Sequence, residues 1–500
     1  MKPFIKKLFQ SILVFINQSK KSLDLFRRNL KKSFLLMKPV ERIGAIVLIG
    51  AALILFFIRM YFYYIDHTKL VPAVGGQMID AIYGDVKYIN PILVQSDAEK
   101  SVSKLVFSGL VKFDGDNVIP DLAEKWDISP DGKKYTFYLR KNATFHDDEP
   151  VTARDIAFTI DSIKAPELKS PLLPSWADVT ATVVDDYTIT FDLPKSYGPF
   201  IYNCSFGVLP SHLPSDEFSK KFIGSGPYKY VKANKKGSQI QSVELKRFAN
   251  FYLTPSIIDK IKLAFYSDQD QAKKAFDNKK ADLLSGIDTK TAKNLSFRTS
   301  KRLELILNIT DTQLKDKDFR QKLLTGQKFA DKVTLRLVSP DTQYQRDQAE
   351  ALKRKYADQN IELTLDFYNS LKMQDILAAR NYQLLLYGFD FGYDRDPYIY
   401  WHTTQINKLN FSGWSDKKTD ILLEDARLIT DLTARNQKYD EFFAIINNEY
   451  LYQDFEPVQY NFSINDKIKN VSAITGNESN SRYNDVADWF INEKRVGKGK

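Results

Sequence analysis

Residues 131–160 read DGKKYTFYLRKNATFHDDEPVTARDIAFTI, a pattern that predicts a strand, a polar turn and a helix in that order. Lys134–Leu139 alternates β-forming side chains with a period of two, as a half-buried strand does. Thr152 is a suitable N-cap, which predicts a helix over Ala153–Ser162. Between them, His146–Glu149 is the densest polar cluster of the chain. It indicates either a metal or acid/base site or a solvated turn, where Asp and Pro are common.

The same mixture of strands and helices continues on both sides of this stretch. The chain has 500 residues, of which 43% are apolar. Single cores stop growing at about 250–300 residues, so we expect more than one lobe. Without strict βαβ periodicity, the pattern predicts an α/β architecture of several lobes. Further strands are predicted over Tyr187–Leu193 and Ile361–Phe367, and helices over Ala349–Asp358, Lys417–Leu432 and Asn436–Leu451.

The net charge of +10 is confined to the N-terminal end. Residues 1–42 contain eleven basic and two acidic side chains, whereas residues 60–500 contain 60 of each sign. A neutral body with a basic leader argues against a nucleic-acid-binding domain. Apolar residues recur at helical spacing between Ile5 and Ile16, which indicates either an amphipathic helix on the inner leaflet or a disordered basic tail.

An apolar segment follows this leader, and we predict a transmembrane anchor over residues 43–65. Its 23 residues would span about 34 Å, enough for a bilayer core of about 30 Å. The basic leader predicts a cytoplasmic N-terminus, so residues 66–500 would be extracytoplasmic, at the cell surface or in the periplasm. Two alternatives stay open: a buried core helix, and a signal peptide cleaved near Ala73-Val74-Gly75.

Motifs that would indicate catalysis are missing from the sequence. It has no phosphate-binding loop, no G-x-S-x-G elbow and no paired cysteines. Its four histidines are scattered, without the spacing of a helical metal site. Cys204 is the single cysteine, so a disulfide within the chain is impossible. We therefore predict no enzyme, no cofactor and no metal.

The order of several short motifs resembles the extracellular solute-binding proteins of family 5, the oligopeptide, dipeptide and nickel-binding components of ABC importers. Each motif is weak alone, but their order covers roughly residues 75–490. They are Ile89-Asn90-Pro91, Val106–Lys112 (VFSGLVK), Pro120–Trp126 (PDLAEKW), the stretch 131–160, Gly224–Tyr230 (GSGPYKY), Asp396-Pro397 and Asn410–Ser415 (NFSGWS).

This resemblance implies a two-lobed periplasmic-binding-protein-like fold (type II, cluster C) with an extra subdomain, which closes on its ligand by a hinge motion. Such a protein captures peptides or similar small solutes, makes no covalent bonds, and delivers the solute to a permease in the same membrane. The outer portion would be monomeric. Lobe I would comprise about residues 70–97, 191–300 and 463–500, the extra subdomain 98–190, and lobe II 301–462.

The resemblance also implies ligand contacts, although the motif departs from the family. Peptide-binding members place a lobe II aspartate on the peptide's amino terminus, because a buried ammonium needs a carboxylate. That position falls at Gly392, so Asp390 or Asp394 would substitute for it, unless both are surface carboxylates and Asp394 pairs with Arg395. The predicted solute contacts are Gln95, Ser96 and Trp176 on one side of the cleft, and Gly388, Phe389, Asp390, Tyr393 and Asp394 on the other.

Lobe II is shorter than in the family, since only Thr310–Lys332 lies between Leu303–Ile309 and Val333–Val338, which resemble two strands of the family. Part of the usual pocket wall would be missing, which implies a more open cleft, a different ligand or a loss of transport binding. A second hypothesis is therefore a membrane-anchored interaction protein that keeps the fold without the transport. A third, an extracytoplasmic hydrolase, would need a catalytic constellation that the sequence does not reveal.

Overall fold

The computed structural model describes residues 38–498 apart from 116, 214–221, 288–292, 456 and 473, together with Arg28, Lys32 and Leu36. The amphipathic helix predicted between Ile5 and Ile16 lies outside these residues. The chain divides into two compact units. The larger is Pro72–Asn492, and the smaller combines the residues up to Val71 with those from Glu493 onward.

The smaller unit consists of a long helix and a strand pair. Helix α2 (Pro39–His67) contains the predicted span 43–65, and none of its residues is buried. Over its most apolar stretch the mean hydropathy is 2.5, and by length and composition it is long and apolar enough to cross a membrane. The chain continues into β1 (Thr68–Ala73), which pairs with β20 (Asn492–Gly497) near the C-terminus. Arg495 Nη1 donates to Thr68 Oγ1 at 3.0 Å, so β20 is held beside the residue that follows the helix.

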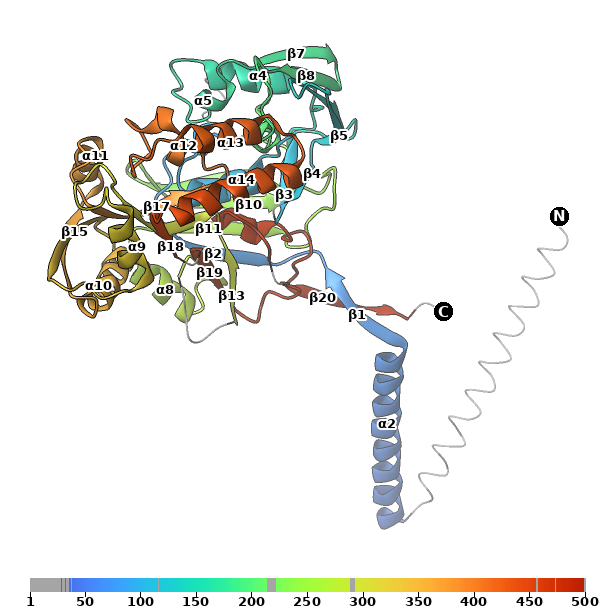
Figure 1. The fold of residues 1–500 in the computed structure, drawn as a ribbon. Coiled ribbons are helices and arrows are strands. Elements are labelled where there is room, and N and C mark those ends of the chain that lie inside the picture. The colour runs from blue at the N-terminus through green and yellow to red at the C-terminus, as the bar shows by residue number, and fades with distance from the viewer. Residues whose placement is uncertain are drawn as a thin grey trace. The chain divides into compact units, whose positions relative to one another are not determined.

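A seven-stranded mixed sheet forms the first part of the larger unit (Figure 1). Its strand β2 (Gln77–Tyr83) runs parallel to β11 and to β12, and the other pairings are antiparallel. From one edge of the sheet to the other, the strands are β13 (Lys293–Arg298), β19 (Gln459–Ile464), β12 (Leu283–Ser285), β2, β11 (Lys260–Tyr266), β10 (Gln239–Arg247) and β9 (Tyr228–Lys236). Helix α8 (Gln269–Asp277) packs on β2, β11 and β12.

A four-stranded antiparallel sheet, which includes the strand of the stretch 131–160, lies at one end of the larger unit in Figure 1. The predicted strand 134–139 is β6 (Lys134–Leu139), and the predicted helix is α4 (Ala153–Lys164), two residues longer than expected. The remaining elements are β5 (Ala123–Ile128), β8 (Thr188–Asp192), β7 (Thr180–Asp185) and the short helix α5 (Leu173–Trp176).

The polar cluster His146–Glu149 forms the turn between these elements. The buried His146 ring has its Nε2 3.0 Å from the carbonyl oxygen of Gly226, and burial lowers the pKa of this histidine to about 4. Gly226 in turn approaches the end of a helix so closely that an added Cβ would lie 2.6 Å from the carbonyl carbon of Val106. The glycines of GSGPYKY therefore serve a close backbone approach. Across the part of the chain that the structure describes, no group of three His, Cys, Asp or Glu is arranged to hold a metal.

A five-stranded sheet forms the third part of the larger unit. Its order is β16 (Ile361–Tyr368), β15 (Val333–Pro340), β17 (Leu384–Asp390), β14 (Lys301–Leu307) and β18 (Tyr452–Asp454). Successive side chains of a strand face opposite sides of a sheet, so Leu303, Leu305 and Leu307 enter one core and Ile306 enters the other. The helices around this sheet are α9 (Lys317–Thr325), α10 (Gln343–Ala357), α11 (Ser370–Ala378), α12 (Tyr398–Trp401), α13 (Lys417–Leu428) and α14 (Leu432–Asn448).

Several helix boundaries differ from prediction. The helix predicted over Lys417–Leu432 ends at Leu428, and α14 begins four residues before the predicted Asn436. Asp431 is the reason, because its side chain accepts a hydrogen bond from the backbone nitrogen of Ala434 and thereby caps a new helix. In α10 the helix begins at Gln343 rather than Ala349, since Thr342 caps it in the same way.

Between the sheets lie short elements that shape the site described below. They are α3 (Asp97–Val106), β3 (Val111–Asp114), β4 (Asn117–Pro120), α6 (Phe200–Asn203), and the 3₁₀ turns η1 (Thr403–Gln405) and η2 (Ser479–Tyr483). Asp80 of β2 and Arg482 of η2 form an ion pair in which both side chains are fully buried. Arg482 also donates to the Ser101 hydroxyl at 3.0 Å and to the Ser479 carbonyl at 2.7 Å. This pair therefore joins β2, α3 and η2.

The variant Arg482→Met is expected to unfold more easily than the wild type. It leaves the carboxylate of Asp80 buried without a cation, which costs about 3–5 kcal/mol. Denaturant unfolding of this variant measures the loss. Arg354→Met, on the exposed side of α10, is the control and should change the free energy of unfolding by less than about 0.5 kcal/mol. Equal stabilities of the two variants would contradict a structural role for the pair.

A buried carboxyl in β14 predicts a pH dependence of stability. Glu304 lies on the same face of the five-stranded sheet as Ile306 and is 2% exposed. One of its carboxyl oxygens has no hydrogen-bond partner among the described residues. Burial, with Asp454 adding to it, raises the pKa of Glu304 to about 8 from an ordinary 4.5. Between these values the folded state retains a proton that the unfolded chain releases, so stability falls as the pH rises.

Glu304→Gln should remove that dependence. We expect the variant to exceed the wild type in free energy of unfolding by on the order of 3 kcal/mol at pH 8, and to match it near pH 4. Denaturant unfolding at several pH values measures the difference. Glu362→Gln, an exposed glutamate of β16, should follow the wild type throughout. A Glu304→Gln curve parallel to that of the wild type would show that Glu304 is ionised in the folded state.

Candidate functional site

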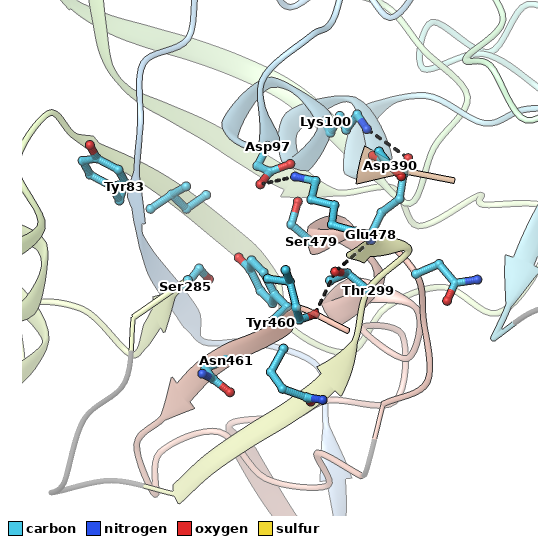
Figure 2. Close-up of a pocket in the computed structure, with 16 residues that line it drawn as sticks. Tyr83, Asp97, Lys100, Ser285, Thr299, Asp390, Tyr460, Asn461, Glu478 and Ser479 are labelled. Atoms are coloured by element: carbon cyan, nitrogen blue, oxygen red, sulfur yellow. Dashed lines mark hydrogen bonds and ion pairs between the residues drawn. The ribbon is translucent and has the colours of Figure 1, made fainter. Parts of the chain in front are cut away.

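Two cavities open in the larger unit. The larger has a volume of about 640 Å³, and its wall is formed mainly by α3, β3, α6 and the segment from Glu478 to Asp488, with Tyr393 joining from the part of the chain after β17. The smaller has a volume of about 250 Å³ and is lined by α3, β14, β17, β19 and the start of η2 (Figure 2). The larger lies within the range of about 300–1,000 Å³ that small-molecule sites occupy, and the smaller lies below it.

Aromatic side chains from three segments meet on the wall of the larger cavity. The ring of Phe113 stacks on that of Tyr393 with 3.6 Å between centroids, and Tyr202 lies parallel to both at 5.9 and 6.5 Å. Phe113 belongs to β3, Tyr202 to α6, and Tyr393 follows β17. The stack therefore joins the part of the unit that contains the five-stranded sheet to the rest, across the cavity.

Two lysines, from α3 and β3, lie on the same wall. Lys104 of α3 and Lys112 of β3 form no hydrogen bond or ion pair with any residue that the structure describes. Burial lowers the pKa of Lys104, against the opposing charges of Asp121 and Glu478. Asp121 accepts a hydrogen bond from the Tyr252 hydroxyl at 2.6 Å, and burial raises the pKa of its carboxyl. Both lysines therefore lie near Asp121, and Lys104 also lies near Glu478, without a direct ion pair to either carboxylate.

Carboxylates gather elsewhere around the same cavity. Asp114 and Asp488 are exposed, and Asp485 is half-buried. Thr475 Oγ1 donates to Asp114 at 3.3 Å, and Ser472 Oγ donates to Asp485 at 3.1 Å. The cavity thus presents cations on its half-buried wall and anions nearer to solvent.

Two ion pairs lie at the smaller cavity, and Figure 2 draws them as dashed lines. Lys100 Nζ lies 2.9 Å from Glu478 Oε1, and Lys301 Nζ lies 3.6 Å from Asp97 Oδ2. The exposed carboxylate of Asp390 accepts a hydrogen bond from Ser300 Oγ at 2.6 Å. The buried hydroxyl of Ser479 also lines this cavity and has no hydrogen-bond partner in the described part of the chain.

Of the eight predicted contact residues, two line a cavity: Asp390 the smaller and Tyr393 the larger. Ser96 caps α3 by accepting from the backbone nitrogen of Glu99, and Gln95 is exposed beside it. Trp176 is fully buried against Phe191, Phe200 and Phe206. Gly388 and Phe389 belong to β17, where the Phe389 ring is in the core. For these residues, contact with a solute stays a prediction.

Asp394 is buried and forms hydrogen bonds with side chains of α14. Arg435, which is 1% exposed, donates from Nε to Asp394 at 2.7 Å, and the Tyr439 hydroxyl donates at 2.9 Å. Burial raises the pKa of Asp394 to about 6, and Arg435 opposes that shift, so the carboxylate is ionised at neutral pH. The partner of Asp394 is therefore a residue 41 positions away, and not the adjacent Arg395.

Several residues of the cavity walls were not predicted from the sequence. Phe113 directly follows the motif VFSGLVK, so its neighbourhood was recognisable, but Lys104 and Lys112 have no distinguishing spacing. Glu478 and Ser479 are some 380 residues from α3. Only the tertiary structure brings them to the same wall.

Two parts joined across a cavity of ligand size define the class of a two-lobed solute-binding protein, and comparison with known proteins agrees. A model described as "Bacterial extracellular solute-binding proteins, family 5 Middle" matches residues 117–324. The crystal structure of the ABC transporter substrate binding protein CtaP from Listeria monocytogenes has the same fold, with a TM-score of 0.73 at 22% identity, covering 84% of this chain and 99% of that one.

Curated relatives extend the likeness along the sequence. "Probable D,D-dipeptide-binding periplasmic protein DdpA" of Escherichia coli is 23% identical over 470 residues, which cover 77% of this chain and 89% of DdpA. "Oligopeptide-binding protein AppA" of Bacillus subtilis is 26% identical over 277 residues, about half of each protein. The chain matches the model of the bacterial extracellular solute-binding proteins of family 5 over residues 117–324, and it resembles members of that family over most of its length. It is therefore a binding protein and not an enzyme, which removes the hydrolase hypothesis.

Asp394→Ala tests the structural assignment of this residue. The variant leaves Arg435 buried without its carboxylate, so we expect it to lose about 3–5 kcal/mol in free energy of unfolding. Thermal and denaturant unfolding measure the loss. Asp390→Ala is the matched control, because Asp390 is exposed, and its stability should change by less than about 0.5 kcal/mol. An Asp394→Ala protein as stable as the wild type would contradict the structural role of Asp394 and favour its role as a ligand contact.

Proposed function

We propose that the chain is the extracytoplasmic substrate-binding subunit of an ABC-type importer, which captures peptides or similar small solutes between two lobes and delivers them to a permease. The observation that carries this proposal is the larger cavity, about 640 Å³ in volume, with aromatic rings and charged groups of both signs on its wall. Relatives named for binding dipeptides and oligopeptides support peptide as the class of solute.

The proposal includes the lobes inferred from the sequence. Lobe I would comprise about residues 70–97, 191–300 and 463–500, with 98–190 as the extra subdomain and 301–462 as lobe II. The seven-stranded, four-stranded and five-stranded sheets support this division. Because β19 (Gln459–Ile464) belongs to the seven-stranded sheet, we move the end of lobe II to about residue 458.

A zwitterionic solute fits the charges of the larger cavity. An ammonium group withdrawn from water without a partner is costly, so Lys104 and Lys112 favour a ligand with a carboxylate. Asp114, Asp485 and Asp488 would face the opposite charge, and Tyr393 with Phe113 would cover the apolar part. A peptide has both charges at a distance from each other. We keep Asp390 and Tyr393 as solute contacts from the sequence prediction.

The proposal also covers topology. The span 43–65 within α2 would be a single-pass anchor with a cytoplasmic N-terminus, supported by the eleven basic residues before it. Tethering would raise the local concentration of the binder near its permease. The alternative of a membrane-anchored interaction protein is not favoured, since the relatives are named for solute binding.

Native mass spectrometry of the detergent-solubilised full chain, followed by release of bound species, tests this proposal. We expect a peptide adduct, and a tenfold or greater weakening of peptide affinity in Lys104→Met and Lys112→Met, since each loses a charge-assisted hydrogen bond of about 1.5–3 kcal/mol. Lys353→Met, exposed on α10, is the control and should bind like the wild type.

Amidating the carboxyl terminus of the bound peptide gives a second test of the same contact. Amidation should weaken binding to the wild type and have little further effect on binding to Lys104→Met or Lys112→Met. Failure of the wild type to bind any member of a peptide pool would contradict the proposed function. Peptide binding that is insensitive to both lysines would contradict only their role.

A further inference from the structure

The two cavities are neighbours that share a wall. Of all the residues that line them, Lys100 and Glu478 alone belong to both. Their side chains form an ion pair at 2.9 Å, and Figure 2 shows this contact at the edge of the smaller cavity. The barrier between the cavities is therefore made of two long, unbranched side chains.

These side chains stand on fixed backbone. Lys100 precedes Ser101, whose hydroxyl accepts a hydrogen bond from Arg482, and Glu478 precedes the buried turn η2 that contains Arg482. The side chains of Lys100 and Glu478 are 27% and 30% exposed, so they are not packed like core residues. Burial lowers the pKa of Lys100, but the ion pair with Glu478 outweighs it and leaves the pKa raised. The pair is closed in this structure, and separating it would require only rotation of the two side chains.

The smaller cavity has polar groups suited to a ligand. The Ser479 hydroxyl is 4% exposed and has no hydrogen-bond partner among the described residues, although a buried hydroxyl normally has one. The carboxylate of Asp390 and the side chains of Tyr460 and Asn461 line the same space. At about 250 Å³ this space is too small for a typical ligand by itself, and it is suited to one end of a longer one.

We propose that the Lys100–Glu478 ion pair sets the length of the peptide that this protein binds. Closed, the pair confines a short peptide to the larger cavity. A longer peptide has to separate the two side chains to place its far end in the smaller cavity, beside Ser479 and Asp390. This inference rests on the proposed peptide-binding function and adds a specificity-determining pair to it.

The test measures the affinity of the full chain for a ladder of peptides of increasing length and otherwise uniform composition. Lys100→Ala/Glu478→Ala removes both charges and opens the passage without leaving an unpaired ion. We expect the ratio of affinities, longer peptide over shorter, to rise at least about fivefold, the equivalent of one ion pair of roughly 1 kcal/mol. The same rise should be seen as longer species among the adducts in native mass spectrometry.

Two further variants separate this role from a general structural effect. Lys100→Glu/Glu478→Lys rebuilds the pair with reversed charges and should restore the wild-type length ratio. Lys332→Ala/Glu362→Ala removes an ion pair of the same composition and the same 2.9 Å distance, outside both cavities, and should leave the ratio unchanged. Thermal unfolding of each variant verifies that it is folded.

The outcomes distinguish the inference from the function on which it rests. A wild type that binds no peptide of any length overturns both. A wild type that binds peptides, with an unchanged length ratio in Lys100→Ala/Glu478→Ala, overturns the inference alone. A rise in the ratio that the charge-swapped variant does not reverse would also overturn it, because the barrier would then depend on something other than the ion pair.

Discussion

The buried ion pair between Asp80 and Arg482 is the constraint on which the rest of the larger unit depends. Two opposite charges removed from water stay there only if they meet and if their remaining hydrogen-bonding groups are satisfied. Asp80 accepts from Ser285 of β12 at 2.8 Å, and Arg482 donates to Ser101 of α3. One ion pair therefore fixes the centre of the seven-stranded sheet, a helix and a turn near the end of the chain. The side chains of Lys100 and Glu478 face each other because their immediate neighbours are held in this way.

Charged groups have two different uses in this molecule. Asp80 with Arg482, and Asp394 with Arg435, are buried and fully partnered, which marks them as structural. Lys104 and Lys112 are on a cavity wall near Asp121 and form no direct ion pair with a described residue, and we propose that they bind the solute. The distinction matters for Asp390, the last residue of β17, and for Asp394, which follows it. Asp394 has a partner and is structural, whereas Asp390 lies on a cavity wall with its carboxylate exposed to solvent.

Local patterns were sufficient for elements whose stability is decided by near neighbours in the sequence. The strand Lys134–Leu139 has the predicted bounds because its alternation matches one buried and one half-buried face. The polar cluster His146–Glu149 is a turn, as the Asp and Pro residues indicated. The single helix predicted over Lys417–Leu432 was wrong at its end, because Asp431 caps the next helix and Arg435 Nη1 bonds the carbonyl oxygen of Ile429 at 2.7 Å. The local pattern favours one continuous helix and the Asp431 cap favours two. Only the positions of both helices in the structure decide between them.

By itself, the sequence determined the family, the mixed strand and helix content, the apolar segment and the absence of catalytic motifs, since these depend on the order and periodicity of residues along the chain. Only the tertiary structure decided which residues surround the cavities. Lys100 and Glu478 are separated by 378 positions, and no periodicity relates residues at that distance. Asp394 and Asp390 are alike in the sequence, and they differ because one side chain enters a core beside Arg435 and the other faces a cavity. Burial and partnership are properties of three-dimensional packing, and they give these identical carboxylates different roles.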